Sequence, residues 1–176
     1  LSPGQMLRAN QLYGLYFNEI ITYYETAMAP FTLSALSQAT PDPALRECLA
    51  GFLADETRHA AMFGRLNRLS APGWYDDSPF RLLAVPPGVR WATALATRRA
   101  ASFPALVWIF LAAEEHSVEV SRRSAANAAQ LEPHWAAAYR AHALDEVRHV
   151  QIDLQLVDHF HAPRSARARR ANAAVV

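Results

Sequence analysis

Two copies of one five-residue string carry the side chains in this sequence that are best suited to metal chemistry. The string Asp-Glu-x-Arg-His occupies residues 55–59 and again residues 145–149. In each copy the glutamate precedes the histidine by three positions, which differ by about 60° around an α-helix, so both side chains can reach one metal ion. A carboxylate with an imidazole suits iron, manganese or zinc better than calcium. The repeat therefore predicts a site for two metal ions. Its ligands would be Glu56, His59, Glu146 and His149.

The two strings alone supply too few ligands for two metal ions, so each needs a carboxylate from the helix before it. On the first helix the candidates are Glu19 and Glu25. Glu25 lies 31 residues before Glu56 and closer to the turn at Pro41, so in an antiparallel helix pair it comes nearer to the depth of Glu56. We therefore predict Glu25 as the ligand, and Glu19 as a surface or supporting carboxylate.

On the third helix the candidates are Glu114, Glu115 and Glu119. Glu115 lies 31 residues before Glu146 and so repeats the offset between the first two glutamates. This equal offset favours Glu115 as the fourth carboxylate ligand. Glu114 replaces it if the helix register differs by one residue, and Glu119, one turn beyond Glu115, is a candidate supporting or shifting ligand.

A further histidine distinguishes the second string from the first. His142 lies four residues before Glu146, on the same helix face, whereas the corresponding position before the first string is Phe52. A single histidine on an inner face is often a hydrogen-bonded core residue. Because this one lies a single turn from a predicted ligand pair, we predict that it is a third histidine ligand.

The charged residues around the ligands also have expected roles. Asp55 and Asp145 can each accept a hydrogen bond from the distal N–H of a metal-bound histidine on the facing helix, which fixes the tautomer. Arg58 and Arg148 can pair with carboxylates and balance their charge. The alternative role of the two arginines is ordinary ion pairing between helices.

The rest of the sequence predicts the helices that position these residues. Apolar residues at helical spacing, with Ala and Leu frequent between prolines, indicate an all-α fold. The expected helices span residues 5–38, 43–69, 88–100, 102–128 and 133–161, with a kink or break at Pro30 and Ser102 as an N-cap. A long connection over residues 70–87 separates the second and third main helices, so we expect a four-helix bundle in which a crossover joins two antiparallel pairs. The bundle domain would span residues 1–163, and the basic Ala/Arg segment 164–176 would be a solvated tail.

Composition and charge limit the class of protein. At 176 residues, with 52% hydrophobic and 19% charged residues, the chain has the size of one globular domain. All 17 basic residues are arginine, which indicates GC-rich bacterial coding, and a net charge of +1 gives no reason to expect nucleic acid as a partner. The single cysteine, Cys48, excludes a Cys-rich metal module. With no apolar run of about 20 residues and no signal pattern, we expect a cytoplasmic protein without a membrane span, trimmed at the N-terminus because it begins at Leu1.

These motifs resemble those of known metalloproteins. Paired Glu-x-x-His motifs, each after a helix with a carboxylate, are similar to the ferritin-like di-iron carboxylate superfamily, which includes ribonucleotide reductase small subunits, bacterial monooxygenases, rubrerythrins and ferritins. His142 before Glu146 narrows the resemblance to the p-aminobenzoate N-oxygenase (AurF-like) family, whose di-iron site has a histidine as a seventh protein ligand in that position. The resemblance covers about residues 19–149 and includes the spacing from Glu115 to His142.

The resemblance implies a ferritin-like bundle that holds two iron ions, with manganese or zinc as alternatives in the same ligands. It implies an O2-dependent oxygenase that oxidises a small organic substrate, in its narrowest form an arylamine at nitrogen, with an electron donor as partner and a homodimer as the assembly. Alternatives are another ferritin-like di-iron oxidase or hydroxylase, a ferroxidase or iron store, and a bundle that has lost its metal. The candidate pocket residues, with core packing as their alternative role, are Tyr23, Tyr24, Trp108 and Phe110.

Overall fold

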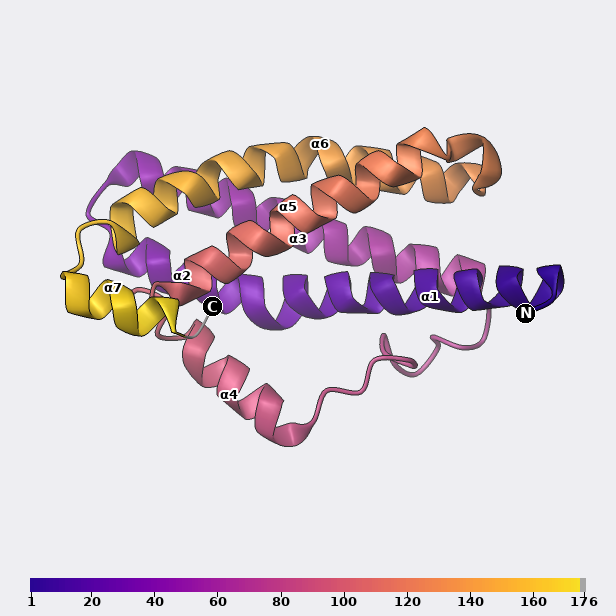
Figure 1. Cartoon of the computed structure of the whole chain (residues 1–176), viewed down its shortest axis with the longest axis horizontal. Coiled ribbons are helices and arrows are strands. Elements are labelled where there is room, and N and C mark those ends of the chain that lie inside the picture. The colour runs from indigo at the N-terminus through magenta and orange to yellow at the C-terminus, as the bar shows by residue number, and fades with distance from the viewer. Residues whose placement is uncertain (175–176) are drawn as a thin grey trace.

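The computed structural model describes residues 1–174, which contain helices and no strands (Figure 1). In chain order the elements are α1 (Pro3–Tyr23), the π-helical turn η1 (Tyr24–Met28), α2 (Ala29–Ala39), α3 (Pro43–Ser70), α4 (Pro87–Thr97), α5 (Ala105–Ala126), the 3₁₀ turn η2 (Ala128–Gln130), α6 (Pro133–Leu156), the π-helical turn η3 (Val157–His161) and α7 (Ala166–Ala173). The predicted all-α class is confirmed. No described helix is long and apolar enough to cross a membrane.

Four long helical segments form the bundle, and they pack as two antiparallel pairs (Figure 1). The continuous segment α1–η1–α2 packs along α3, and α5 packs along α6, while α3 and α6 join the two pairs. The long connection after α3, with α4 at its end, runs outside the bundle and returns to contact α2 and η1. The sequence therefore predicted the ferritin-like order correctly, with its crossover between the second and third main helices.

Capping side chains explain where most of the long helices begin. Asp42 accepts a hydrogen bond from the backbone N–H of Ala44 at the start of α3, and Pro43 is the first helical residue, as the sequence predicted. Ser2 forms a reciprocal capping box with Gln5 at the start of α1. The prediction of Ser102 as an N-cap was wrong, because two further non-helical residues follow it and α5 begins at Ala105, with Pro104 at the N-cap position.

Pro30 does not end the first helical segment, although it was expected to kink or break it. The chain instead widens into the π-helical turn η1 directly before α2, in which proline occupies one of the first two positions. Proline has no backbone N–H to donate, and a wider turn accommodates this loss without stopping the helix. Because Glu25 lies inside η1, its direction differs from the one a regular α-helix would give it.

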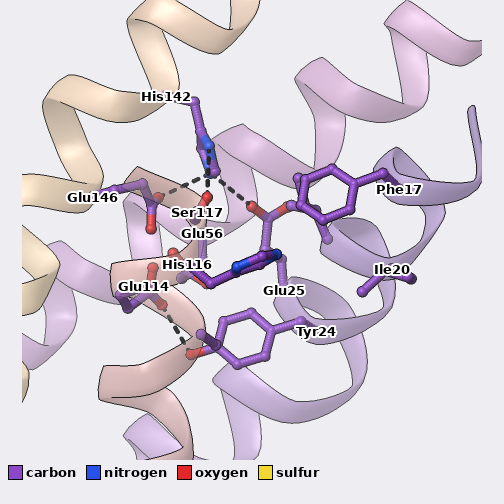
Figure 2. A pocket seen from close by; sticks show the side chains of 12 residues that line it. Phe17, Ile20, Tyr24, Glu25, Glu56, Glu114, His116, Ser117, His142 and Glu146 are labelled. Atoms are coloured by element: carbon purple, nitrogen blue, oxygen red, sulfur yellow. Dashed lines mark hydrogen bonds and ion pairs between the residues drawn. The ribbon is translucent and has the colours of Figure 1, made fainter. Parts of the chain in front are cut away.

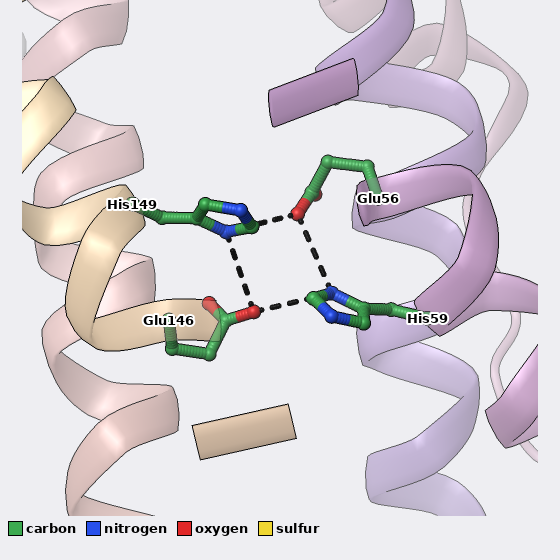
Figure 3. A group of neighbouring side chains, drawn as sticks. All are labelled: Glu56, His59, Glu146 and His149. Atoms are coloured by element: carbon green, nitrogen blue, oxygen red, sulfur yellow. Dashed lines mark ion pairs between the residues drawn. The ribbon is translucent and has the colours of Figure 1, made fainter. Parts of the chain in front are cut away.

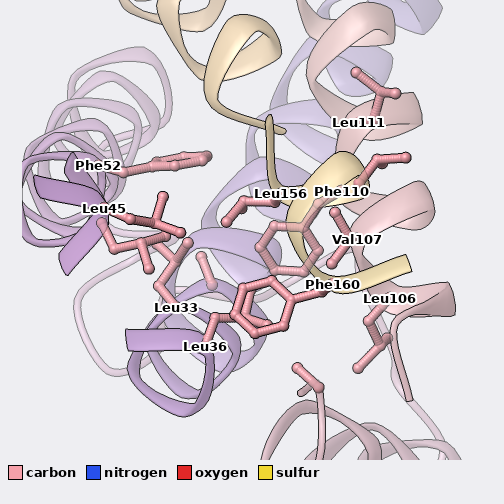
Figure 4. Close-up of a cluster of buried hydrophobic side chains, with 14 residues drawn as sticks. Leu33, Leu36, Leu45, Phe52, Leu106, Val107, Phe110, Leu111, Leu156 and Phe160 are labelled. Atoms are coloured by element: carbon pink, nitrogen blue, oxygen red, sulfur yellow. The ribbon is translucent and has the colours of Figure 1, made fainter. Parts of the chain in front are cut away.

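Apolar side chains form two clusters at different depths along the bundle. The larger cluster, which includes Leu33, Phe52, Phe110 and Phe160, fills the end where α2, α3, α5 and η3 meet (Figure 4). The smaller cluster contains Ile21, Phe63, Leu66 and Tyr139. Each of the four helical segments carries polar residues between its contributions to the two clusters. These residues, called the polar layer below, are Glu25, Glu56, His59, Glu114, His142, Glu146 and His149.

The basic tail is folded in part, contrary to the expectation that it is solvated. Residues 166–173 form α7, and the side chain of Asn172 is buried. Its Oδ1 accepts a hydrogen bond from the backbone N–H of Ala105, the first residue of α5, at 2.8 Å. Arg164 also donates a hydrogen bond to the backbone carbonyl of Ala101. The tail therefore satisfies backbone groups at the start of α5.

Candidate metal centre

The two Glu-x-x-His pairs face each other in the middle of the bundle. Glu56 and His59 project from α3 toward Glu146 and His149 on α6 (Figure 3). Across the two helices, Nδ1 of His59 lies 3.2 Å from Oε1 of Glu146, and Nδ1 of His149 lies 3.3 Å from Oε1 of Glu56. All four side chains are at most 2% exposed. One potential ligand atom from each lies within 4.8 Å of the others, which is a spacing that a metal ion can bridge.

A second group of potential ligands adjoins the first. Nε2 of His142 lies 2.9 Å from Oε1 of Glu146 and 3.4 Å from Oε1 of Glu25 (Figure 2). Nδ1 of His59 lies 3.7 Å from the same oxygen of Glu25, so Glu25, His59 and His142 form a second candidate metal group. His59 belongs to both groups. The structure thus brings together six of the seven predicted ligands.

Glu115 is the exception, because it is exposed on the outside of α5. The inward positions of α5 follow helical spacing through Val107, Phe110 and Leu111, and this row continues to Glu114, which is 2% exposed. Glu114 lines the same cavity as the other carboxylates. The equal offset of 31 residues misled the prediction because it assumes that both pairs have the same register.

The registers of the two pairs differ for two visible reasons. The first pair contains the π-helical turn η1 and a three-residue link between α2 and α3, whereas the second pair is joined through η2 and a longer link. The apolar row of α5, rather than the offset, was the signal that identifies Glu114. The remaining candidate, Glu119, forms ion pairs with Arg122 and Arg123.

Glu19 is neither a surface carboxylate nor part of a candidate metal group. It is completely buried and accepts hydrogen bonds from the hydroxyl of Tyr75 and from the backbone N–H groups of Arg81, Leu82 and Leu83. All of its donors belong to the long connection after α3. Glu19 therefore anchors this connection to α1 and is satisfied without a metal ion.

The aspartates of the two strings contact the histidines at Nε2, the ring nitrogen that faces away from the candidate metal site, as predicted. Nε2 of His59 lies 3.0 Å from Oδ2 of Asp145, and Nε2 of His149 lies 3.4 Å from Oδ2 of Asp55, each across the α3–α6 interface. These contacts favour the tautomer whose Nδ1 is free to bind a metal ion. Two arginines complete a surface network around the aspartates. Arg58 and Arg148 each pair with both Asp55 and Asp145.

Unpartnered buried polar atoms are concentrated in the polar layer. They include Glu25 Oε2, both carboxylate oxygens of Glu56, Glu146 Oε1 and the Nδ1 atoms of His59 and His149. Buried polar groups are nearly always hydrogen bonded, and each one that is not costs free energy. Metal ions would satisfy carboxylate oxygens and imidazole nitrogens together, so the donor set fits the two metal ions that the sequence predicts.

The ionisation of these groups reflects burial and mutual repulsion. Burial, together with the charges of Glu56 and Glu146, raises the pKa of Glu25 well above its usual range. Burial also lowers the pKa of His142 to about 2, which keeps its imidazole neutral and able to act as a ligand. Burial alone would lower the pKa of His59, but the neighbouring carboxylates of Glu146, Glu56 and Asp145 favour the protonated imidazole more strongly and raise this pKa to about 10. In the absence of metal, protons must offset the crowded negative charge.

A cavity of about 120 Å³ opens beside the polar layer (Figure 2). Its polar-layer walls are Glu25, Glu56, Glu114, His142 and Glu146, and its other walls are Phe17, Ile20, Ile21, Tyr24, Ala113, His116 and Ser117. Of the aromatic residues considered for a pocket, only Tyr24 lines this cavity. Tyr23 packs against Phe80, Phe110 belongs to the apolar core, and Trp108 contacts His161.

Asp153 is a buried acid near the centre that was not singled out from the sequence. Asp153 is completely buried on α6, one turn beyond His149, and neither of its carboxylate oxygens has a hydrogen-bond partner. Burial, with the charges of Glu56 and Glu146, raises its pKa well above its usual range. Its position seven residues after Glu146, on the same helix face, was the available signal.

Fold and site together define a class of protein: a ferritin-like helical bundle in which paired Glu-x-x-His motifs and further carboxylates form a candidate two-metal centre. The family model described as p-aminobenzoate N-oxygenase AurF matches residues 17–176, and the chain belongs to this family. The match includes every candidate ligand and extends through the described part of α7. No curated protein and no solved structure matches the chain.

Proposed function

We propose that this protein is a non-haem di-iron oxygenase that uses O2 to oxidise the nitrogen of a small amine, with an arylamine as the expected substrate. The observation that carries the proposal is the group of unpartnered carboxylate oxygens and imidazole nitrogens beside a cavity, in a chain of the AurF family. The proposed ligands are Glu25, Glu56, His59, Glu114, His142, Glu146 and His149.

The donor set supports iron as the metal. Four carboxylates and three imidazoles combine hard and intermediate donors, which suit iron, and the four negative charges balance two divalent ions. Manganese and zinc fit the same donors, and metal analysis of the purified protein distinguishes the three metals. When bound, the two iron ions supply the electrons and the Lewis acidity that reduction of O2 requires.

The proposed reaction balances with an external reductant. One oxygen atom of O2 enters an N–H bond of the amine to give a hydroxylamine, and the other leaves as water. The second oxygen atom takes two electrons, which a reduced iron–sulfur or flavin protein would provide, and two protons from solvent. An electron donor is therefore a required partner of this function.

The side chains of the protein orient the ligands and limit access of water. Asp145 and Asp55 hold His59 and His149 through their Nε2 atoms. The hydroxyl of Tyr24, whose pKa burial raises, keeps its proton and donates to Oε1 of Glu114 at 2.9 Å. Apolar walls around the cavity would keep a bound amine and the centre from bulk water.

Metal analysis combined with product analysis tests the proposal. Protein loaded with ferrous iron under anaerobic conditions is expected to hold about two irons per chain, and to convert an aromatic amine to its hydroxylamine after O2 is admitted in the presence of a reductant. The double variant His59→Ala/His149→Ala is expected to lose both properties, because it removes a ligand from each string. Absence of bound metal in the unmodified protein would contradict the proposal. Iron oxidation without an amine product, in a 24-subunit shell, would indicate the ferroxidase alternative.

A further inference from the structure

The charges around the cavity bear on the class of amine that it can hold. Among the described residues that line it there are four glutamates and no arginine, and the chain contains no lysine. His116 is the only lining histidine outside the candidate metal groups, and it is exposed at the rim with its ring edge-on to Phe17 at 5.9 Å. A positive charge at that exposed position would be screened by solvent. The cavity therefore has no buried cation with which to pair an anionic substrate.

Few hydrogen-bond donors of the cavity wall are free. The hydroxyl of Tyr24 donates to Glu114. Oγ of Ser117 lies 3.3 Å from Nδ1 of His142 and accepts its proton when Nε2 is the metal ligand, so the hydroxyl proton of Ser117 is the one wall donor that these contacts leave free. The other non-ligand residues of the inner wall, Ile20, Ile21 and Ala113, belong to α1 and α5, whose backbone N–H groups are bonded within their helices. A carboxylate entering this cavity would lose its hydration and gain no cation and at most the hydroxyl of Ser117 as a partner, and such burial is costly.

The loaded centre would not supply the missing positive charge. Four carboxylates, from Glu25, Glu56, Glu114 and Glu146, balance two divalent metal ions. The wall near the centre therefore offers acceptors rather than donors, whereas Phe17, Ile20 and Ala113 offer apolar surface. This arrangement would direct the N–H groups of an amine toward the carboxylates and its hydrocarbon part toward the apolar wall.

We infer that the site accepts a small, uncharged apolar amine with a single ring and discriminates against amines that carry a carboxylate, including p-aminobenzoate. This inference rests on the proposed function and specifies its substrate class. The volume of the cavity, about 120 Å³, agrees with the size. An apolar protein cavity of about 150 Å³ holds one benzene molecule, so this smaller cavity excludes a substrate with two rings.

A matched pair of amines tests the inference by equilibrium binding. In 4-methylaniline a methyl group occupies the position of the carboxylate in p-aminobenzoate, so the two differ mainly in charge. Calorimetry on the anaerobic, iron-loaded protein at pH 8 is expected to show binding of 4-methylaniline at least about 100-fold tighter, which corresponds to about 2.8 kcal/mol. Equal or tighter binding of p-aminobenzoate would overturn the inference, as would the absence of binding by 4-methylaniline.

Ile20 provides a variant in which the charge of the wall changes. It lines the cavity, is only partly buried and makes no polar contact, so a longer side chain can extend from it toward solvent. Ile20→Arg is expected to strengthen binding of p-aminobenzoate by about tenfold, because it adds the missing cation. Ile20→Gln adds length and polarity without charge and is the matched control, expected to leave the preference for 4-methylaniline unchanged. An equal effect of both substitutions would contradict the role of charge.

The binding and turnover results separate the two proposals. Tight binding of 4-methylaniline without its oxidation would support the substrate class and contradict the oxygenase. Oxidation of p-aminobenzoate as fast as that of 4-methylaniline would support the oxygenase and overturn the substrate class.

Discussion

At the scale of single residues, Glu114 and Glu115 form a natural pair for testing the fourth carboxylate. They are adjacent in sequence and identical in type, but only Glu114 is buried in the cavity wall. Glu114→Ala is expected to lower the iron content below two per chain and to abolish amine oxidation, whereas Glu115→Ala is expected to leave both unchanged. Metal analysis and product analysis on both variants provide the measurement. If Glu115→Ala lost iron and activity while Glu114→Ala kept both, Glu115 would be the ligand, as the equal offset indicated.

His142 permits a similar test, because its counterpart in the first string is a phenylalanine. Nε2 of His142 lies within 3.4 Å of carboxylate oxygens of both Glu25 and Glu146, which no core-packing role requires. His142→Phe preserves the aromatic contact with Phe63 but removes the nitrogen. We expect this variant to fold with its helix content intact and to bind iron at least about tenfold more weakly, as measured by metal titration. Unchanged iron affinity would show that His142 is a packing residue.

At the scale of elements, the sequence predicted the helices and the facing strings because both depend on local patterns. The repeat of Glu56 and His59 at Glu146 and His149 specifies faces of helices, and those faces meet in the structure. Register between separate helices depends on links and on irregular turns, and no local pattern encodes these. The equal offset therefore pointed to Glu115, which is exposed, whereas the neighbouring Glu114 is buried.

The same limit explains two other differences from the predicted fold. Glu19 bonds to backbone groups of the long connection, and backbone N–H groups leave no signature in the sequence. Asn172 docks in the same way on the backbone of Ala105, so a segment with the composition of a solvated tail is anchored to the bundle. Contacts between side chain and distant backbone are thus the part of this fold that sequence patterns do not reveal.

The contact of Asn172 yields a prediction for α7. Its buried amide bonds the first backbone N–H of α5 and the carbonyl of Ala168, so Asn172→Ala leaves both groups without this partner. We expect a loss of about 1–2 kcal/mol in the free energy of unfolding, measured with urea. Asn127→Ala, which removes an exposed amide at the other end of α5, is the control and is expected to cost less. Equal losses would mean that docking of α7 does not stabilise the start of α5.

At the scale of the whole molecule, the polar layer interrupts what would otherwise be one continuous apolar core. Glu25, Glu56 and Asp153 all have pKa values raised primarily by burial, so their ionisation opposes folding. The layer therefore destabilises the metal-free bundle. A metal ion that binds only the folded chain restores stability, by an amount that grows with the logarithm of its free concentration relative to its dissociation constant.

The stability of the metal-free bundle depends on pH, and the raised pKa of His59 gives the direction of this dependence. Its folded pKa of about 10 exceeds the ordinary value of 6.5, so its contribution to stability is fully present below pH 6.5 and is lost as the pH rises toward 10. The raised pKa of Glu25 acts in the same direction, because the folded carboxyl retains a proton that the unfolded one has released. His142, whose pKa is lowered to about 2, acts the opposite way, but only below pH 6.5, where the unfolded imidazole takes up a proton.

Above neutrality the shifts therefore agree, and metal-free protein is expected to lose on the order of 2 kcal/mol in the free energy of unfolding between pH 7 and pH 9.5, since each pKa unit corresponds to about 1.36 kcal/mol. Urea unfolding at the two pH values measures this loss. Zinc-loaded protein is the control: because a metal ion replaces the protons as the source of positive charge, its stability is expected to change less over the same range. A metal-free protein that is equally stable at both pH values would mean that the polar layer relaxes without metal, and that the bundle is not strained by the site it encloses.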